Sequence, residues 1–470
     1  MIGPHTFCLM ERVDVAVVGG GPAGAAAGHA AAEAGAGAIV VEKGVPRADR
    51  ADPGPDSTDA AGILDYWVDI MGIHPEEFPD DVILHDLDRA EFVGPRETCV
   101  LRSTGIDSSY DGFGFCMQRA RFDDFLRARA ERAGATYRVG TSVRDVRLDE
   151  PDAPERHVVE LADGSEVAAD HVVLADGPQR TVTNRVLDRL LPFDVTDRLG
   201  ATRANHIAYQ EHRRLPTEVA AEVRGAIRFW WGYIPGHTAY PWVFPNDEDV
   251  ARIGLTMPID LDLDSIRDRD AYPLLHDGDE TVPPGRVYLR RLLEREYGDA
   301  YDVEEDFPLV EDRGKTHGTE TYPISSTRPV DSPVGAGVAV AGGAMGTTSA
   351  FHEGGDHVAV RTGAIAGRLA AEGNLAAYND AWKAAVGNEL RRNVTLADMC
   401  WDYAPGDWDR VFRTGRELVS RAGSGWSMFG LGNATRAGLD ALRLVGTYKW
   451  RKFGLRDGQY VQIRESEYTT

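Results

Sequence analysis

The chain has 470 residues, a length that predicts two or three domains, and 43% of them are hydrophobic, enough to bury sizeable cores. Its formal net charge is −24, with acidic residues spread along the whole chain, so nucleic acid is excluded as an expected partner. Such an acidic balance is typical of a protein kept soluble in high salt; an ordinary acidic cytosolic enzyme is the alternative.

The four cysteines lie far apart and form no C-x-x-C pair: Cys8, Cys99, Cys116 and Cys400. This spacing predicts neither a zinc ribbon nor an intrachain iron–sulfur cluster, so no metal site is expected. It also fits a reducing compartment. Because the sequence has no run of about 18 apolar residues and no signal-peptide core, a cytoplasmic protein is predicted.

The first informative stretch begins after residues 1–9, which carry no pattern and are expected to form a disordered extension. Residues 13–18 are apolar and β-branched, as in a buried parallel strand. Gly19, Gly21 and Gly24 follow at G-x-G-x-x-G spacing. In this motif the first glycine permits a tight turn, the second lets the backbone approach a pyrophosphate, and the third lets a helix pack on the strand.

The other parts of the motif follow these glycines at the expected spacing in the sequence. An alanine-rich helix is expected over residues 23–34, and a second apolar strand over 38–41. Glu42 ends that strand, about 20 residues after the glycines, where a carboxylate accepts both hydroxyls of a ribose. Strand, glycines, helix, strand and acid together predict a dinucleotide-binding unit.

Up to residue 191 the sequence predicts further βα units around the same nucleotide site. The expected elements are a helix over 60–72, a helix over 119–133 capped by Gly134, and strands over 143–148 and 157–161. Another apolar strand ends at the small, acidic turn of residues 175–177.

Between residues 192 and 323 the composition changes. Prolines punctuate this region, and aromatic residues gather in it: Phe229, Trp230, Trp231, Tyr233, Tyr240, Trp242 and Phe244. Short alternating stretches such as 226–231 predict an antiparallel sheet with one face over a cavity, which we interpret as an inserted substrate domain. The aromatic residues would alternatively form the core of that sheet, and the two interpretations are compatible. Residues 260–305 look helical and charged.

The βα pattern returns late in the chain. Residues 338–346 read as a strand that runs into glycines, followed by a polar stretch and a helix that ends near residue 371. This junction belongs in the same sheet as the first motif, and its helix N-terminus favours a negatively charged ligand. Another helix is expected over 375–403.

The C-terminal segment of residues 425–456 is locally basic. Its single acid is Asp440, and its six basic residues are Arg436, Arg443, Lys449, Arg451, Lys452 and Arg456. Large apolar residues are interleaved with them, so the segment predicts an amphipathic helix for peripheral contact with an anionic membrane. The alternative is a helix packed on the acidic body of the protein through intramolecular ion pairs.

These motifs, in this order, resemble those of large FAD-dependent oxidoreductases with a glutathione-reductase-like nucleotide fold. They are the first glycine motif, R-x-x-F-D at residues 119–123, the turn at 175–177 and the late glycines from Gly342. More narrowly, the chain resembles the geranylgeranyl reductase family, whose archaeal members saturate the prenyl chains of membrane lipids. Tyr240 to Pro245, followed by Gly254, is similar to that family's Y-x-W-x-F-P segment, which lines the isoprenoid tunnel. With the acidic composition, the resemblance suggests a halophilic archaeon as the source.

The resemblance implies an α/β fold with a discontinuous Rossmann-type FAD-binding domain, formed by residues 10–191 and 324–395. A substrate domain with an antiparallel sheet would be inserted at 192–323, and a helical, basic region would follow over 396–470.

By the same resemblance Gly19, Gly21 and Gly24 would hold the FAD pyrophosphate and Glu42 the adenosine ribose. The other implied cofactor-binding residues are Pro22, Ala23, Lys43, Arg119 (phosphate or ribityl region), Val143 (adenine, through its backbone), Asp176 (flavin linker), Gly342, Gly343 and Gly346 (beneath the flavin), Gly354 and Gly355. The implied substrate-binding residues are Trp231, Tyr240, Trp242 and Phe244.

Two features depart from the family pattern. Relatives usually carry G-D-A-A-G at the late junction, where the Asp binds the ribityl chain, whereas Gly343 occupies that position here and the next carboxylates are Glu353 and Asp356. Relatives also often carry a C-x-G-G element after the second strand, and residues 50–62 contain none.

The chemistry implied is hydride transfer from reduced flavin to a C=C bond, with a proton added from the other side. The Tyr240 hydroxyl and the His352 imidazole are the candidate proton donors. No second glycine fingerprint for a nicotinamide cofactor is visible, so ferredoxin, a deazaflavin and transiently bound NAD(P)H are the candidate electron donors.

Three other functions stay open at this point. One is a quinone-linked dehydrogenase resembling electron-transfer-flavoprotein oxidoreductases, which would need a separate iron–sulfur partner. Another is a flavin-dependent monooxygenase or halogenase: residues 230–235 are similar to the halogenase W-x-W-x-I-P, but Gly232 replaces its second Trp. The last is a non-enzymatic protein that binds prenyl lipid.

Overall fold

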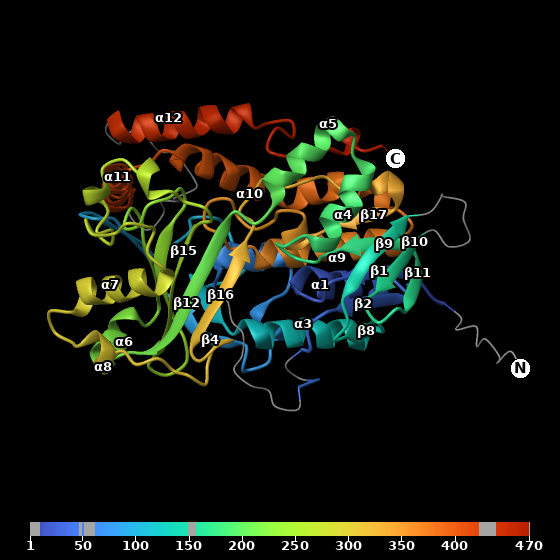
Figure 1. Ribbon diagram of the computed structural model, residues 1–470, viewed down its shortest axis with the longest axis horizontal. Coiled ribbons are helices and arrows are strands. Elements are labelled where there is room, and N and C mark those ends of the chain that lie inside the picture. The colour runs from blue at the N-terminus through green and yellow to red at the C-terminus, as the bar shows by residue number, and fades with distance from the viewer. Residues whose placement is uncertain (1–9, 47–48, 51–61, 149–156, 423–438, 470) are drawn as a thin grey trace, which may run out of the picture.

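The computed structural model describes residues 10–46, 49–50, 62–148, 157–422 and 439–469 (Figure 1). The predicted extension at residues 1–9 lies outside them. The first sheet has seven strands in the order β8-β2-β1-β11-β10-β9, and β17 also pairs with β11. Their bounds are β1 (Glu11–Val18), β2 (Ala38–Glu42), β8 (Thr136–Val139), β9 (Val143–Leu148), β10 (His157–Leu161), β11 (Glu166–Leu174) and β17 (Val338–Val340).

The parallel part of this sheet is the predicted nucleotide-binding unit. β1 pairs in parallel with β2 and β11, β2 with β8, and the end of β11 with β17. The central strands are buried on both faces, which explains their continuous β-branched sequences. The chain therefore has a Rossmann-type α/β fold, and the late strand joins the first motif in one sheet as predicted.

Two helices meet backbone to backbone beside this sheet. α1 (Pro22–Glu33) packs on α9 (Asp356–Ala371) and on α3 (Arg119–Ala133). A Cβ on Gly363 or Gly367 would lie 2.0 Å from the carbonyl oxygen of Ala23 or Ala27, so both positions require glycine. This close approach brings the N-termini of α1 and α9 to the same edge of the sheet.

The second sheet also has seven strands, in the order β16-β12-β15-β14-β13-β5-β6. Their bounds are β5 (Arg89–Val93), β6 (Thr98–Leu101), β12 (His206–Arg214), β13 (Ala226–Trp230), β14 (Tyr240–Pro245), β15 (Val250–Pro258) and β16 (Thr319–Ile324). All neighbours are antiparallel except β5 and β13. The sheet thus extends beyond the region 192–323 and takes in two strands from the first third of the chain.

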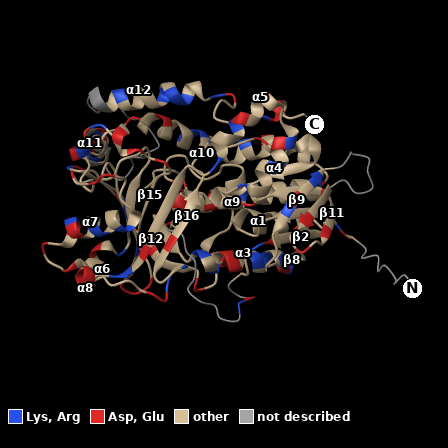
Figure 2. Ribbon diagram, viewed as in Figure 1, with Lys and Arg blue, Asp and Glu red and all other residues tan. Residues whose placement is uncertain are grey.

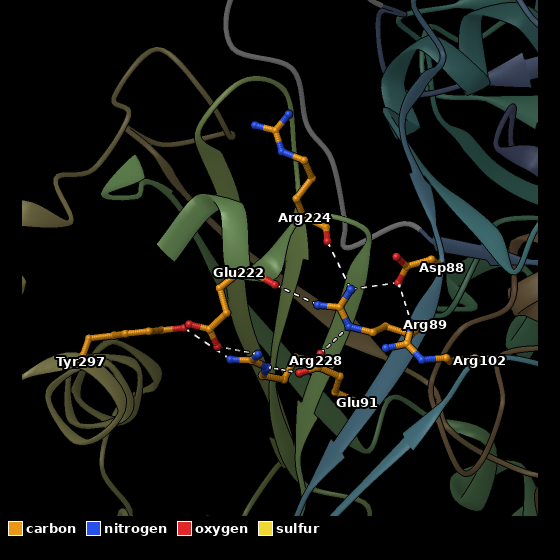
Figure 3. Close-up of polar contacts among 8 residues, drawn as sticks. All are labelled: Asp88, Arg89, Glu91, Arg102, Glu222, Arg224, Arg228 and Tyr297. Atoms are coloured by element: carbon orange, nitrogen blue, oxygen red, sulfur yellow. Dashed lines mark hydrogen bonds and ion pairs between the residues drawn. The ribbon is translucent and has the colours of Figure 1, made fainter. Parts of the chain in front are cut away.

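An ion-pair network ties β5 to β13 at this parallel junction (Figure 3). The two carboxylate oxygens of Glu91 accept from Arg89 Nε and Arg228 Nε, each at 2.6 Å. Arg228 also pairs with Glu222 at 2.8 Å. Burial raises the pKa of Glu91, but the two guanidinium groups outweigh it and lower this pKa below its usual value. The network therefore keeps a charged carboxylate at the junction.

The remaining elements surround these two sheets. A three-stranded sheet consists of β3 (Gly62–Leu64), β7 (Gly114–Met117) and β4 (Ile83–Leu87), in that order, and α2 (Asp65–Met71) follows β3. The other helices are α4 (Thr181–Leu190), α5 (Phe193–Thr196), α6 (Thr217–Val223), α7 (Gly285–Tyr297), α8 (Val303–Asp306), α10 (Tyr378–Cys400), α11 (Pro405–Ala422) and α12 (Leu439–Gly454). Residues 260–284 form turns and two short 3-10 helices, Leu263–Ser265 and Arg269–Ala271, so the predicted helix is confined mainly to α7.

Figure 1 shows α12 lying beside α10 on the outside of the molecule, where the two helices are in contact. Beneath them, residues of α10, α11 and α12 share an apolar cluster with the aromatic strand β14. In the part of the chain that the structure describes, no helix is both long and apolar enough to span a bilayer.

Candidate active site

A cavity of about 720 Å³ has walls from both halves of the fold. The nucleotide-binding half contributes Gly21, Glu42 and Arg119 among others. The second sheet contributes the four predicted substrate residues, Trp231, Tyr240, Trp242 and Phe244. Side chains expected to hold a cofactor and side chains expected to hold a substrate therefore border one continuous space.

Each of the three motif positions is a glycine for a different structural reason. Gly19 has a φ of 97° and contacts the backbone of Ala175, the residue after β11. A Cβ on Gly24 would lie 1.8 Å from the carbonyl oxygen of Gly19, so this position allows the helix to leave the strand. A Cβ on Gly21, in contrast, meets nothing within 4 Å and would project into open space. Gly21 is therefore the glycine that leaves room for a ligand, as the fingerprint predicts.

Glu42 is held rigidly at the end of β2. Its Oε2 accepts from Gly20 N at 2.7 Å, and its Oε1 accepts from Gly44 N at 2.6 Å. Each carboxylate oxygen keeps a second lone pair, so the group can still accept hydroxyl donors from the cavity. This is the arrangement that ribose binding requires.

Two helix N-termini and one arginine make the same region favourable for phosphate. The cavity is lined by Pro22 at the start of α1 and by Gly355 and Asp356 at the start of α9. Arg119 contacts Asp356 at 3.0 Å and Asp123 at 2.8 Å, which fixes its guanidinium beside the α9 terminus. Unpaired backbone N–H groups and a nearby cation attract a pyrophosphate.

The late junction is tight and lacks a carboxylate. Gly342 has a φ of 62°, and its Cβ would lie 2.5 Å from that of Ala23 on α1. Gly343 lines the cavity, and its carbonyl oxygen accepts from Nη2 of Arg180 at 3.3 Å. Burial lowers the pKa of this arginine to about 10. A buried cation therefore contacts the turn at Gly343.

The other predicted cofactor residues fall into two groups. Those that line the cavity are Pro22, Ala23, Lys43, Asp176, Gly343, Gly354 and Gly355. Those that do not are Gly19, Gly24, Gly342, Gly346 and Val143. The glycines in the second group shape the backbone around the cavity, whereas Val143 begins β9 at the far edge of the sheet from β8. The Asp176 carboxylate accepts from Val182 N at 2.7 Å and so caps α4.

The aromatic residues form a stacked group on the second sheet. Trp231 stacks on Tyr240 at a ring distance of 4.3 Å and on Phe351 at 5.1 Å. The ring of Trp242 lies against Gly254, where an added Cβ would come within 2.6 Å of it. Trp231, Tyr240 and Trp242 are buried and also line the cavity, so core packing and a place on the cavity wall are compatible for these three residues.

The two candidate proton donors are joined to each other. The Tyr240 hydroxyl donates to the carbonyl oxygen of His352 at 2.7 Å. Burial raises the pKa of Tyr240 well above its ordinary value and lowers that of His352 to about 3. At neutral pH His352 is an uncharged imidazole, and Tyr240 is a weak acid whose hydroxyl proton already forms the hydrogen bond to the His352 carbonyl oxygen.

Sequence reasoning missed several residues of the cavity wall: Trp67, Arg127, Tyr137, Thr347 and Thr348. Trp67 on α2 stacks between His352 at 5.0 Å and His357 at 4.2 Å. Its helical spacing marked it only as part of an apolar face, and no local signal showed that this face meets the late junction.

The residues present fit FAD. Gly21 leaves open space in front of a helix N-terminus, Glu42 presents a fixed carboxylate, and Arg119 supplies a cation between them and α9. Family models agree with this fit: residues 14–57 match the FAD binding domain family, and residues 84–236 match the tryptophan halogenase family.

Curated relatives cover most of the chain. It is 27% identical over 397 residues to digeranylgeranylglycerophospholipid reductase 2 of Methanopyrus kandleri, covering 80% of this chain and 84% of that protein. It is 27% identical over 404 residues to the digeranylgeranylglycerophospholipid reductase of Methanoculleus marisnigri, covering 83% and 87%.

Among solved structures, a geranylgeranyl bacteriochlorophyll reductase-like protein from Thermoplasma acidophilum superposes with a TM-score of 0.66 at 19% identity, covering 95% of this chain and 99% of that one. A flavin-dependent brominase superposes with a TM-score of 0.56 at 18% identity, covering 93% and 99%. At these identities the two structures report on the fold.

The fold, the cavity and these relatives together define an FAD-dependent oxidoreductase. Within this class the chain is geranylgeranyl reductase-like, as its motifs predicted.

The halogenase alternative meets a steric obstacle at Gly232, which stands in the place of the second Trp of the halogenase motif. Its φ is 76°, and a Cβ there would lie 3.0 Å from the Cα of Pro405 and 3.1 Å from the ring of Trp408. A tryptophan does not fit at this position, so the sheet is shared with halogenases while this part of their motif is not.

Proposed function

We propose that this protein reduces C=C bonds in the isoprenoid, geranylgeranyl-type chains of membrane lipids. The observation that carries the proposal is the single cavity shared by the FAD-type cradle and the aromatic wall of β13 and β14. A long unsaturated hydrocarbon suits that wall because it offers stacked rings and few charges. The curated relatives bear the name of such a reductase.

Bound FAD supplies hydride chemistry, and the electrons reach it from an external donor such as ferredoxin, a deazaflavin or NAD(P)H. Pro22, Gly21 and Arg119 would hold the pyrophosphate, and Glu42 would accept the ribose hydroxyls. Trp231, Tyr240, Trp242 and Phe244 exclude water and hold the prenyl chain. The hydrogen bond from Tyr240 to His352 fixes the late-junction loop against the aromatic wall. Val143 is not part of this proposed site, since it does not line the cavity.

The proposed function is tested by the visible spectrum of the protein purified in high salt. We expect a flavin spectrum that dithionite bleaches and that returns anaerobically when an unsaturated prenyl lipid is added, with the saturated lipid detected by mass spectrometry. Reoxidation by a quinone analogue alone would instead support the electron-transfer alternative. A purified protein without flavin would favour the non-enzymatic alternative.

We also propose that the outer face of α12 docks on an anionic membrane. Leu442, Trp450 and Phe453 share one helical face and are 48%, 75% and 60% exposed. Arg443 and Lys449 on the same helix are also exposed. Figure 2 shows basic segments along α12. Arg451 instead donates to the carbonyl oxygen of Asp398 on α10. Some basic residues of α12 are therefore exposed, as membrane contact predicts, while Arg451 packs on the body of the protein. Arg436 lies outside the described residues.

This docking face predicts a measurable loss of membrane binding. Replacing Trp450 and Phe453 together by alanine should lower partition onto anionic vesicles by about tenfold per residue, because each buried aromatic is worth at least ~1.5 kcal/mol. Cosedimentation with phosphatidylglycerol vesicles measures the effect. Leu309→Ala, which removes another exposed apolar side chain, should change nothing. Equal loss in both variants, or none in either, would exclude α12 as the contact.

A further inference from the structure

Glu353 is a buried carboxyl group on the wall of the cavity, and the proposed mechanism has not used it. Its side chain is only 4% exposed, and the residue lines the cavity together with Tyr240 and Gly354. Neither carboxylate oxygen has a hydrogen-bond partner among the residues that the structure describes. A buried carboxylate that has no well-formed hydrogen bond is costly unless it is protonated.

The groups around Glu353 come from several elements. His206 of β12 is the nearest titratable side chain, with Nε2 3.7 Å from Glu353 Oε1. Tyr240 of β14 and His352 also border it, and Thr256 of β15 and Ser326 after β16 contribute hydroxyl groups. Burial raises the pKa of Glu353 to about 8, and the two hydroxyls oppose this only in part. Burial also lowers the pKa of His206 to about 4. At neutral pH this site therefore pairs a carboxylic acid with a neutral imidazole.

A chain of polar groups leads from Glu353 toward the surface. His206 Nε2 lies 3.1 Å from the carbonyl oxygen of His237 and 3.3 Å from the hydroxyl of Thr238. The ring of His237 stacks at 4.0 Å on Trp401, which is 58% exposed. These polar groups therefore lie between Glu353 and the exposed ring of Trp401.

The backbone is strained at both ends of this chain. Glu353 has a φ of 60° and Thr238 a φ of 50°, backbone conformations that residues other than glycine rarely adopt. Such strain persists where the surrounding structure fixes a residue for a function. Here it turns the Glu353 side chain toward β12 and the cavity rather than toward solvent.

We propose that Glu353 is the proton donor for reduction of the substrate double bond, an inference that rests on the proposed function. The π bond breaks, one carbon gains a hydride from the reduced cofactor, and the other gains the proton of the Glu353 carboxyl. The products are a saturated C–C bond, the oxidised cofactor and a glutamate carboxylate. The carboxylate then regains a proton from solvent before the next turnover.

Glu353 suits this role better than the two donors suggested by the sequence. A general acid works best when its pKa lies near the operating pH. His352 has a pKa of about 3, so at neutral pH it is an uncharged imidazole with no imidazolium proton to give. Tyr240 is a far weaker acid, and its hydroxyl donates a hydrogen bond to a carbonyl oxygen. These two residues remain part of the wall and position the loop that carries Glu353.

The test is Glu353→Gln, which keeps the shape of the side chain and removes its acid. We expect normal flavin content and normal bleaching by dithionite, with reoxidation by prenyl lipid slowed about 100-fold or more, the range of a lost general acid. In the wild type the reoxidation rate should fall as the pH rises through about 8, because the protonated form is the active one. Glu353→Asp should recover part of the rate.

A second readout needs neither substrate nor turnover. Burial also raises the pKa values of Asp331 and Glu296, so the readout is the component of the protonated-carboxyl infrared band that titrates near pH 8. This component should be present in the wild type at pH 7, disappear above the pKa of Glu353, and be absent from Glu353→Gln. The matched control is Glu320→Gln, another buried carboxyl that lies outside the cavity and contacts Gln210; it should keep both the band and the reoxidation rate.

Wild-type reoxidation in Glu353→Gln, or absence of the band, would overturn the proposal. If the wild type itself is not reoxidised by prenyl lipid, the proposed function fails and the donor role fails with it, while the band still reports whether Glu353 is protonated.

Discussion

Replacing Gly21 by alanine should abolish FAD retention without weakening the apoprotein. The backbone of Gly21 has a φ of −68° and a ψ of −173°, which alanine adopts without strain. A Cβ there meets no protein atom within 4 Å, so the methyl group projects only into the cavity, where the pyrophosphate must approach the α1 terminus. We expect FAD affinity to fall by about 100-fold or more, equivalent to about 2.8 kcal/mol, as measured by fluorescence titration of the apoprotein.

Substitutions at two other glycines distinguish a loss of FAD affinity from a loss of apoprotein stability. Gly24→Ala should destabilise the apoprotein as well, because its methyl group would lie 1.8 Å from the Gly19 carbonyl oxygen. Gly278→Ala adds a methyl group that also meets nothing within 4 Å but lies outside the cavity, so it should alter neither property. Urea unfolding of the apoproteins provides the comparison. Unchanged flavin content in Gly21→Ala would show that the phosphate lies elsewhere.

The nucleotide-binding half of the fold was predictable because its signal is local. The strand, glycines, helix and second strand lie within 32 residues, and β1, α1 and β2 follow the predicted bounds to within two residues. The late junction was predictable for the same reason, since an apolar strand that enters glycines and then a helix repeats the first pattern. Parallel pairing of β11 with β17 confirms that both belong to one sheet.

The second sheet was predictable only in part. β13, β14 and β15 pair in sequence order, but β12 pairs with β15 and β16, and β5 pairs in parallel with β13 across more than 130 residues. The residues that fix this pairing, Glu91 and Arg228, look in the sequence like ordinary surface charges. Only the fold shows that they meet at 2.6 Å in a buried network. Long-range pairing of this kind leaves no periodic pattern in either segment.

The residues of the candidate site were also predictable only in part. Glycines and aromatic residues were predictable because turns and clusters have characteristic residue types. The acid–base groups were not, because their character depends on burial. Glu353 is one of many acidic residues in a very acidic chain, and the sequence does not show that its side chain is 4% exposed beside His206. A pKa is set by the environment of a group, which the fold determines.

Replacing Trp242 by alanine should impair lipid turnover far more than cofactor binding. The Trp242 ring lies against Gly254 and meets Tyr240 edge-on at 5.9 Å, so it forms part of the aromatic wall without contacting the glycine motif. Its removal widens the cavity where the prenyl chain would be held. We expect at least a tenfold slower reoxidation of the reduced protein by prenyl lipid, with flavin content unchanged, and a stability loss of up to about 3–5 kcal/mol for a buried tryptophan.

The matched control is Trp230→Ala. Trp230 is 1% exposed, but it packs in the separate apolar cluster with Tyr233 and Leu292 and does not line the cavity. Both variants lose the same buried side chain, so both should lower the urea midpoint. Only Trp242→Ala should also slow the reaction of the folded protein with lipid. A similar slowing in both variants would mean that Trp242 acts only through stability, and loss of flavin from Trp242→Ala alone would assign that residue to the cofactor site rather than to the substrate wall.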